Sequence, residues 1–268
     1  MLKISRVLAT LLCGALLTAC GGGGSSSTPI NVSAGVYSGT VDGAPWLTVL
    51  LPDNVSTNWY SLHYLTNNAD LYSGKFTGVG SANATAASAD LIYSPANAKP
   101  LHNGSGSMSA PITSTLSTSL NILSANSDPG KNVNASLTST ATTAQFSDLN
   151  GPWTGQISYG DAAVVNNKTI TFTAASNAAT ANNFDFTACF ISNINLTPTP
   201  QVNTFNVSLQ LDAQTGCRFT EAPSATSFSL TGVAFITPSP KTLYFLAIKT
   251  SGPNKGQGFS FKGTPSPV

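Results

Sequence analysis

Short segments in which apolar and polar residues alternate constrain the fold of this chain more than any other feature. The stretch 205–211 (FNVSLQL) alternates over its whole length, as expected for a strand with one buried face. Asp128-Pro129-Gly130 has the chemistry of a tight turn, because Pro fixes φ and Gly permits a positive φ. No segment beyond the first 19 residues has a helical period of 3.6. The sequence therefore predicts an all-β protein.

The predicted strands form two sets of seven or eight, and that number is enough to close a small barrel. Closure would also remove sheet edges, which few charges protect here. We expect two tandem small antiparallel β-barrels, with two β-sandwiches as the competing architecture. The predicted strands are 36–41, 46–51, 59–65, 71–79, 89–93, 112–120, 133–140 and 144–146, then 153–159, 169–174, 184–196, 204–211, 228–236, 243–248 and 258–262.

Each set opens with the pattern Gly-x-aromatic-x-Gly. The first copy is Gly35-Val-Tyr37-Ser-Gly39 and the second is Gly151-Pro-Trp153-Thr-Gly155, which indicates an internal repeat at the scale of a domain. We therefore expect an N-terminal β-domain over 33–147 and a C-terminal β-domain over 148–268. The pattern is similar to the first strand of lipocalin-like barrels, which implies an aromatic plug at one barrel end and glycines that permit strong bending.

The N-terminus has the features of an export signal. Lys3 and Arg6 precede an apolar run over 7–17, which is too short to span a bilayer. The following Leu17-Thr18-Ala19-Cys20 resembles the lipobox of bacterial lipoproteins. The resemblance implies that 1–19 is a signal peptide recognised through Leu17, Thr18 and Ala19, and that Cys20 becomes a diacylglyceryl cysteine with acyl chains such as palmitate. The alternative is an ordinary secretory signal with an incidental cysteine.

Residues 20–32 are expected to form a lipidated cysteine and a flexible Gly/Ser-rich tether. The run GGGGSSS over 21–27 would reach on the order of 15–20 Å as a coil. Two or three acyl chains on one residue would anchor the chain firmly. Gly21, where an Asp tends to retain Gram-negative lipoproteins at the inner membrane, indicates the outer membrane, facing either the periplasm or the exterior. The membrane is the one partner that the sequence predicts.

Composition excludes a nucleic-acid partner and suggests a disulfide. Charged residues make up 8% of the chain and the net charge is +1, so no basic patch is available for phosphates. Of the four cysteines, Cys13 would leave with the signal and Cys20 would be lipidated. Cys189 and Cys217 are expected to pair in an oxidising compartment. Two free thiols or half of a metal site are the alternatives.

The residues give no catalytic constellation. Glu221 is the only Glu, the Asp residues are scattered, and the Gly-x-Ser-x-Gly elbow of serine hydrolases is absent. His63 is predicted to lie on the surface of a strand and His102 in a loop. We therefore expect that the protein is not an enzyme and that it has no catalytic residue, cofactor or metal. A hydrolase is the remote alternative.

Aromatic side chains are the remaining candidates for a binding site, although they fill barrel cores more often than they bind ligands. The expected function is a membrane-anchored lipoprotein with a non-catalytic structural or binding role. The alternative is a lipocalin-like module that binds a small apolar ligand. The aromatic candidates are Trp46, Trp59, Trp153, Tyr37, Tyr60, Tyr64 and Tyr93.

The order of these motifs resembles a family of uncharacterised proteobacterial lipoproteins over most of the chain after the signal. The resemblance implies location and architecture, and no activity or ligand. Ala188 stands where members of the family usually have Gly before the first cysteine of the pair. The matching segments are 35–40, 47–64, 149–155, Cys189-Phe190, 203–211, Cys217, 231–235 and 258–264.

Overall fold

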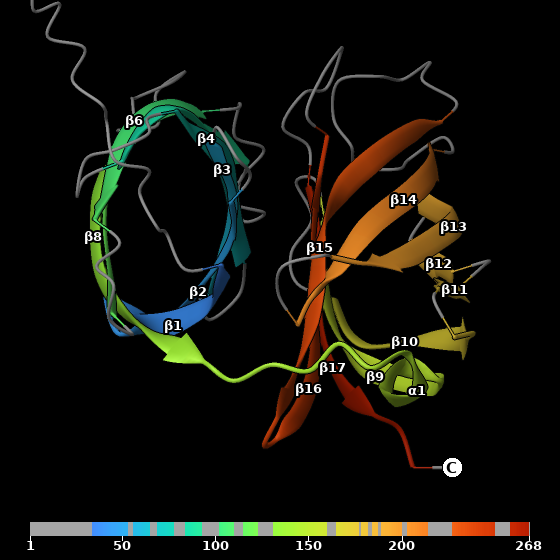
Figure 1. Cartoon of the computed structure of the whole chain (residues 1–268). Coiled ribbons are helices and arrows are strands. Elements are labelled where there is room, and N and C mark those ends of the chain that lie inside the picture. Colours follow the sequence, from blue (N-terminus) through green and yellow to red (C-terminus); the bar gives the residue numbers. More distant parts are fainter. Residues whose placement is uncertain are drawn as a thin grey trace, which may run out of the picture.

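The protein consists of two β bodies that lie side by side and are joined by one linker (Figure 1). Nearly all described residues are in antiparallel strands, and the described part of the chain contains a single short helix. The computed structural model describes residues 34–52, 56–64, 69–77, 84–92, 102–109, 115–122, 131–159, 165–176, 178–181, 184–186, 189–199, 203–213, 227–249 and 258–267.

The N-terminal body is a closed barrel of eight strands in sequence order. The last strand pairs back onto the first, with Val36 opposite Thr140. Asp42 and Gly43 form the two-residue turn of the first hairpin with φ of 50° and 77°, the backbone of a type I′ turn. The strands are β1 (Gly35–Val41), β2 (Ala44–Pro52), β3 (Ser56–Tyr64), β4 (Ala69–Thr77), β5 (Ala84–Ile92), β6 (His102–Ser109), β7 (Thr115–Ile122) and β8 (Lys131–Thr140).

The C-terminal body is a nine-stranded antiparallel sheet that follows α1 (Phe146–Leu149) in the chain. The order is β11-β10-β9-β17-β16-β15-β14-β13-β12, and β11 also pairs with β13. The strands are β9 (Gly151–Tyr159), β10 (Val165–Ala174), β11 (Ala179–Ala181), β12 (Phe184–Phe186), β13 (Cys189–Pro198), β14 (Phe205–Ala213), β15 (Phe228–Pro238), β16 (Lys241–Ile248) and β17 (Gly258–Pro265).

The C-terminal sheet encloses its own apolar core. The alternation predicted for 205–211 is confirmed, because the four apolar side chains of this stretch are buried while Asn206 and Ser208 are exposed. Phe146 of α1 joins the same core and lies 4.9 Å from Phe205 between ring centroids. The core also includes Trp153, Ile157, Phe172, Leu196, Phe245, Phe259 and Phe261.

A second apolar cluster lies between the two bodies, and we call it the interlobe contact. It joins the outer wall of the barrel to the outer face of β15 and β16, whose alternate residues face the core of the C-terminal sheet. Both faces of these two strands are therefore buried. The interlobe contact consists of Val36, Leu47, Val49, Leu62 and Leu71 from the barrel and Val233, Phe235, Leu246 and Ile248 from the sheet.

Three predictions of local structure are wrong. The segment 144–146 is not a strand, because it belongs to the linker and the start of α1, a single turn too short to show a helical period. The segment 184–196 is two strands, since Phe186 lies opposite Cys189 in a β12–β13 pairing. His102 is the first residue of β6 rather than a loop residue, although its Asn-Gly neighbours have the composition of a turn.

Candidate functional site

The inner wall of the barrel brings together the polar and aromatic side chains of β1, β2 and β3. Because Val36, Leu47 and Leu62 lie on the outer wall, the residues that alternate with them face inward. The register places Tyr37 opposite Thr48, and Thr48 opposite Ser61. Trp46, Leu50, Trp59 and His63 share this face. The wall therefore has two indoles, a phenol, an imidazole and two hydroxyls close to one another.

The hydroxyls of this wall bond to their neighbours within it. The Trp46 indole donates from Nε1 to Thr48 Oγ1 over 2.9 Å. Thr48 Oγ1 and Ser61 Oγ are 2.7 Å apart. All three residues are completely buried. Hydrogen bonding of this kind offsets the cost of burying polar groups. These three hydrogen-bonded side chains can therefore be part of a packed interior.

His63 is part of this interior, and the prediction that it lies on the surface is wrong. The side chain is 1% exposed, and its Nε2 lies 3.2 Å from the carbonyl oxygen of Val41. The ring lies 5.1 Å from the Trp46 ring between centroids, tilted by 47°. Strand alternation places His63 on the same face as Ser61. The sequence could not say whether that face was turned to solvent or to the lumen.

Along β1 to β3 the interior is filled by side chains. Trp46, Thr48, Trp59 and Ser61 have no exposed surface, and Leu50 is almost as completely buried. Burial also raises the pKa of the Tyr37 phenol. An eight-stranded barrel can be filled in this way or can hold one small ligand. The described wall corresponds to the filled case.

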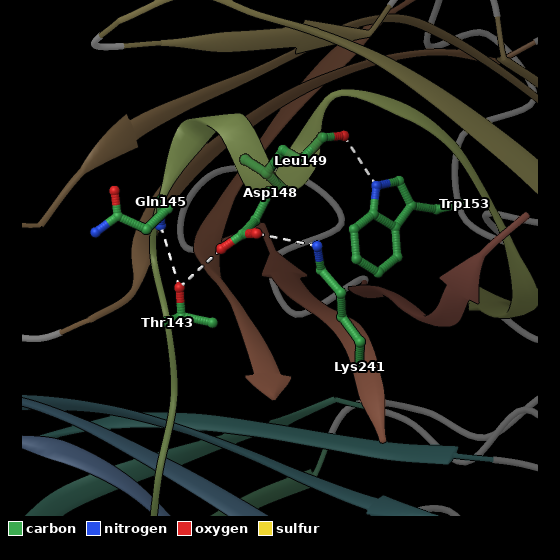
Figure 2. A network of polar contacts seen from close by, with 6 residues as sticks. All are labelled: Thr143, Gln145, Asp148, Leu149, Trp153 and Lys241. Atoms are coloured by element: carbon green, nitrogen blue, oxygen red, sulfur yellow. Dashed lines mark hydrogen bonds and ion pairs between the residues drawn. The ribbon is translucent and has the colours of Figure 1, made fainter. Parts of the chain in front are cut away.

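A second polar network fixes the linker to the C-terminal sheet (Figure 2). The linker residue Thr143 pairs through its backbone with Ile236 of β15. Its hydroxyl donates to Asp148 Oδ2 over 3.1 Å, and Lys241 Nζ reaches Asp148 Oδ1 at 3.0 Å. Asp148 therefore connects the linker, α1 and the β15–β16 hairpin.

Trp153, the aromatic residue of the second Gly-x-aromatic-x-Gly segment, lies beside this network. Its indole Nε1 donates to the carbonyl oxygen of Leu149 over 2.9 Å, and its ring packs in the core of the sheet. Lys241 Nζ lies 5.8 Å from the ring centroid. The polar groups of this network and of Trp153 bond to one another. We therefore describe the region as a structural joint between the linker and the sheet.

Several residues predicted as sites lie outside the described residues. These include the lipobox residues Leu17 to Cys20, together with Cys217 and Tyr93. Cys189 begins β13 with its backbone opposite Ala213. No disulfide occurs among the residues that the structure describes.

Within the same described ranges, no group of three His, Cys, Asp or Glu residues could hold a metal ion. No described helix has both the length and the apolar character needed to cross a bilayer.

Sequence reasoning missed Thr48 and Ser61, and it missed the interlobe contact. A signal existed in each case. Thr48 and Ser61 have the same strand parity as Trp46 and Trp59, which places them on the aromatic face. The apolar run 233–236 in β15 interrupts the alternation seen in β14, and such runs indicate strands buried on both faces.

Comparison with known proteins gives no relative to argue from: no family model, no curated protein and no solved structure matches the chain. The resemblance to proteobacterial lipoproteins therefore stays a prediction that rests on the motifs themselves.

Proposed function

We propose that the protein is a lipid-anchored, non-catalytic lipoprotein of the outer membrane, whose role is to hold a two-lobed β body at a fixed shape above the bilayer. The interlobe contact is the main observation in support. It is apolar on both sides and buried, unlike the more polar contacts that let domains move. The Thr143–Asp148–Lys241 network adds a second attachment at the linker.

A structural role is favoured over a ligand-carrying role by the filled inner wall of the barrel. A carrier of small apolar molecules needs a lumen with surface open to the ligand, and Trp46, Trp59 and Leu50 offer almost none. Native mass spectrometry of the purified protein would test this choice. A co-purified small molecule at stoichiometric amounts would favour the lipocalin-like alternative.

The same wall supports the proposal that the protein is not an enzyme. Ser61 Oγ bonds to the Thr48 hydroxyl, and His63 Nε2 lies against the carbonyl oxygen of Val41. A nucleophilic serine needs a base in hydrogen-bond reach and an open approach for substrate. Neither arrangement is present at these described residues.

Two finer features of the architecture also belong to the proposal. The β11–β13 pairing connects strands near the two ends of the C-terminal sheet, which supports a second barrel in tandem with the first. A Cys189–Cys217 disulfide would tie the start of β13 to the segment after β14. The support is the register, because Cys189 lies opposite Ala213, only four positions before Cys217 in the sequence.

Metabolic labelling with palmitate tests the anchor directly. The wild-type chain should incorporate label and fractionate with outer membranes, whereas Cys20→Ala should do neither. Cys13→Ala is the matched control, because it removes a cysteine from the predicted signal peptide and should leave labelling unchanged. Equal labelling of the Cys20→Ala protein would refute the proposed anchor.

A further inference from the structure

Several apolar residues of the barrel face outward. Val36, Leu47, Val49, Leu62 and Leu71 lie on the outer wall and are buried in one cluster with residues of the C-terminal sheet. The inner wall opposite them combines two tryptophans and a leucine with the buried polar residues Thr48, Ser61 and His63. Without the sheet, the outer wall would expose a contiguous apolar patch, which monomeric proteins rarely tolerate.

Two strands of the barrel, β5 and β6, offer little apolar material in compensation. β5 (ATAASADLI) and β6 (HNGSGSMS) are rich in Ala, Ser and Gly. Their only apolar side chains larger than alanine are Leu91, Ile92 and Met108. Burial of apolar surface is the main force that stabilises a fold. Since these two strands contribute little of it, the apolar contact that covers β1 to β4 is a large part of what the barrel buries.

The C-terminal sheet is in the opposite situation. Its core contains residues from nearly all of its strands together with Phe146 and Leu149 of α1. Phe172 and Phe245 stack at 5.6 Å between ring centroids, and Phe261 meets Phe245 edge-on at 6.2 Å. The core of this sheet is complete without any residue of the barrel.

We propose that the barrel is a dependent folding unit, which is folded only while its outer wall is seated on β15 and β16, whereas the C-terminal sheet folds by itself. The outer face of these two strands is then a template for the barrel. Phe235 and Tyr244 stack on this face at 5.1 Å between centroids, so it is already ordered by its own cross-strand contacts.

Hydrogen exchange measured by mass spectrometry tests this dependence on the full chain in detergent. Leu246→Asn places an amide in the interlobe contact on the sheet side, and Leu62→Asn does so on the barrel side. Each variant should bring the exchange of peptides from β1 to β3 close to that of an unfolded chain. Peptides from β9, β10 and β14 should keep their protection. Ser208→Asn, at an exposed position of β14, is the control and should change neither set.

Two outcomes would overturn the proposal. If the peptides of the barrel keep their protection in both variants, then the barrel is stable without the contact. If both bodies lose protection together in Leu62→Asn, then the two form one cooperative unit and the sheet does not fold alone. Leu62→Asn lies in the barrel and leaves β16 intact. A loss of protection in the sheet of this variant therefore cannot come from local damage to β16.

Discussion

Gly155, the second glycine of the C-terminal Gly-x-aromatic-x-Gly copy, should be far less tolerant of alanine than Gly35, the first glycine of the N-terminal copy. A Cβ added at Gly155 would lie 1.9 Å from the carbonyl oxygen of Lys262 and 2.4 Å from the Cα of Gly263. Both atoms belong to the backbone of β17, so no side chain can move aside. β9 and β17 would have to separate by about 1 Å, a distance at which their ladder hydrogen bonds are lost.

The expected cost follows from these contacts. Two ladder hydrogen bonds contribute about 1 kcal/mol each, and overpacking of a dense region adds about 1–3 kcal/mol. Gly155→Ala should therefore lower the free energy of unfolding by about 3–5 kcal/mol. That is a large part of the roughly 5–15 kcal/mol that stabilises an ordinary domain.

Gly35→Ala is the matched control, because Gly35 holds the first position of the other copy of the pattern. The nearest atom to its added Cβ is Tyr37 Cε2 at 3.7 Å, an ordinary contact. Gly35→Ala should change the free energy of unfolding by less than about 1 kcal/mol. The lower entropy of the unfolded chain should make the folded state slightly more stable. Urea unfolding followed by far-UV circular dichroism measures both. Equal midpoints for the two variants would refute the argument from strand approach.

Three further predictions concern the joint, the interlobe contact and the cysteines. Asp148→Ala should cost at most about 1 kcal/mol, because its partner Lys241 is 41% exposed and exposed ion pairs contribute little; a double-mutant cycle with Lys241→Ala that gives a much larger coupling would contradict this. Burial raises the pKa of Tyr60 above 10.0, so the folded state binds the phenol proton more tightly and stability should fall as pH rises beyond 10. This alkaline slope should be shallower in Tyr60→Phe, and an unchanged slope would count against the assignment. Protein exported without reductant should yield a Cys189–Cys217 linked peptide, and alkylation of both thiols before reduction would disprove the pairing.

The sequence was a good guide wherever a strand has one buried and one exposed face. The buried Val207 and Leu209 alternate with the exposed Asn206 and Ser208, and this pattern was legible because solvent lies on the other side of β14. It was a poor guide for short elements. The single turn of α1 gives too few residues for a helical period, so the sequence wrongly predicts a strand over 144–146.

The site on the inner wall was only half predictable. Alternation placed Ser61 and His63 on one face of β3, but the choice between solvent and lumen depends on how the sheet closes. That choice is made by β8 returning to β1, where Val36 lies opposite Thr140. The pairing joins residues more than a hundred positions apart, and no local pattern specifies it.

The sequence by itself determined the all-β character of the two bodies. This property follows from residue periodicity and turn chemistry, which act over a few residues. Only the tertiary structure decided what covers the second apolar face of β15 and β16. The pattern shows that both faces avoid water, but apolar burial is non-directional, so the chain does not encode locally that the outer wall of the barrel is the surface seated there.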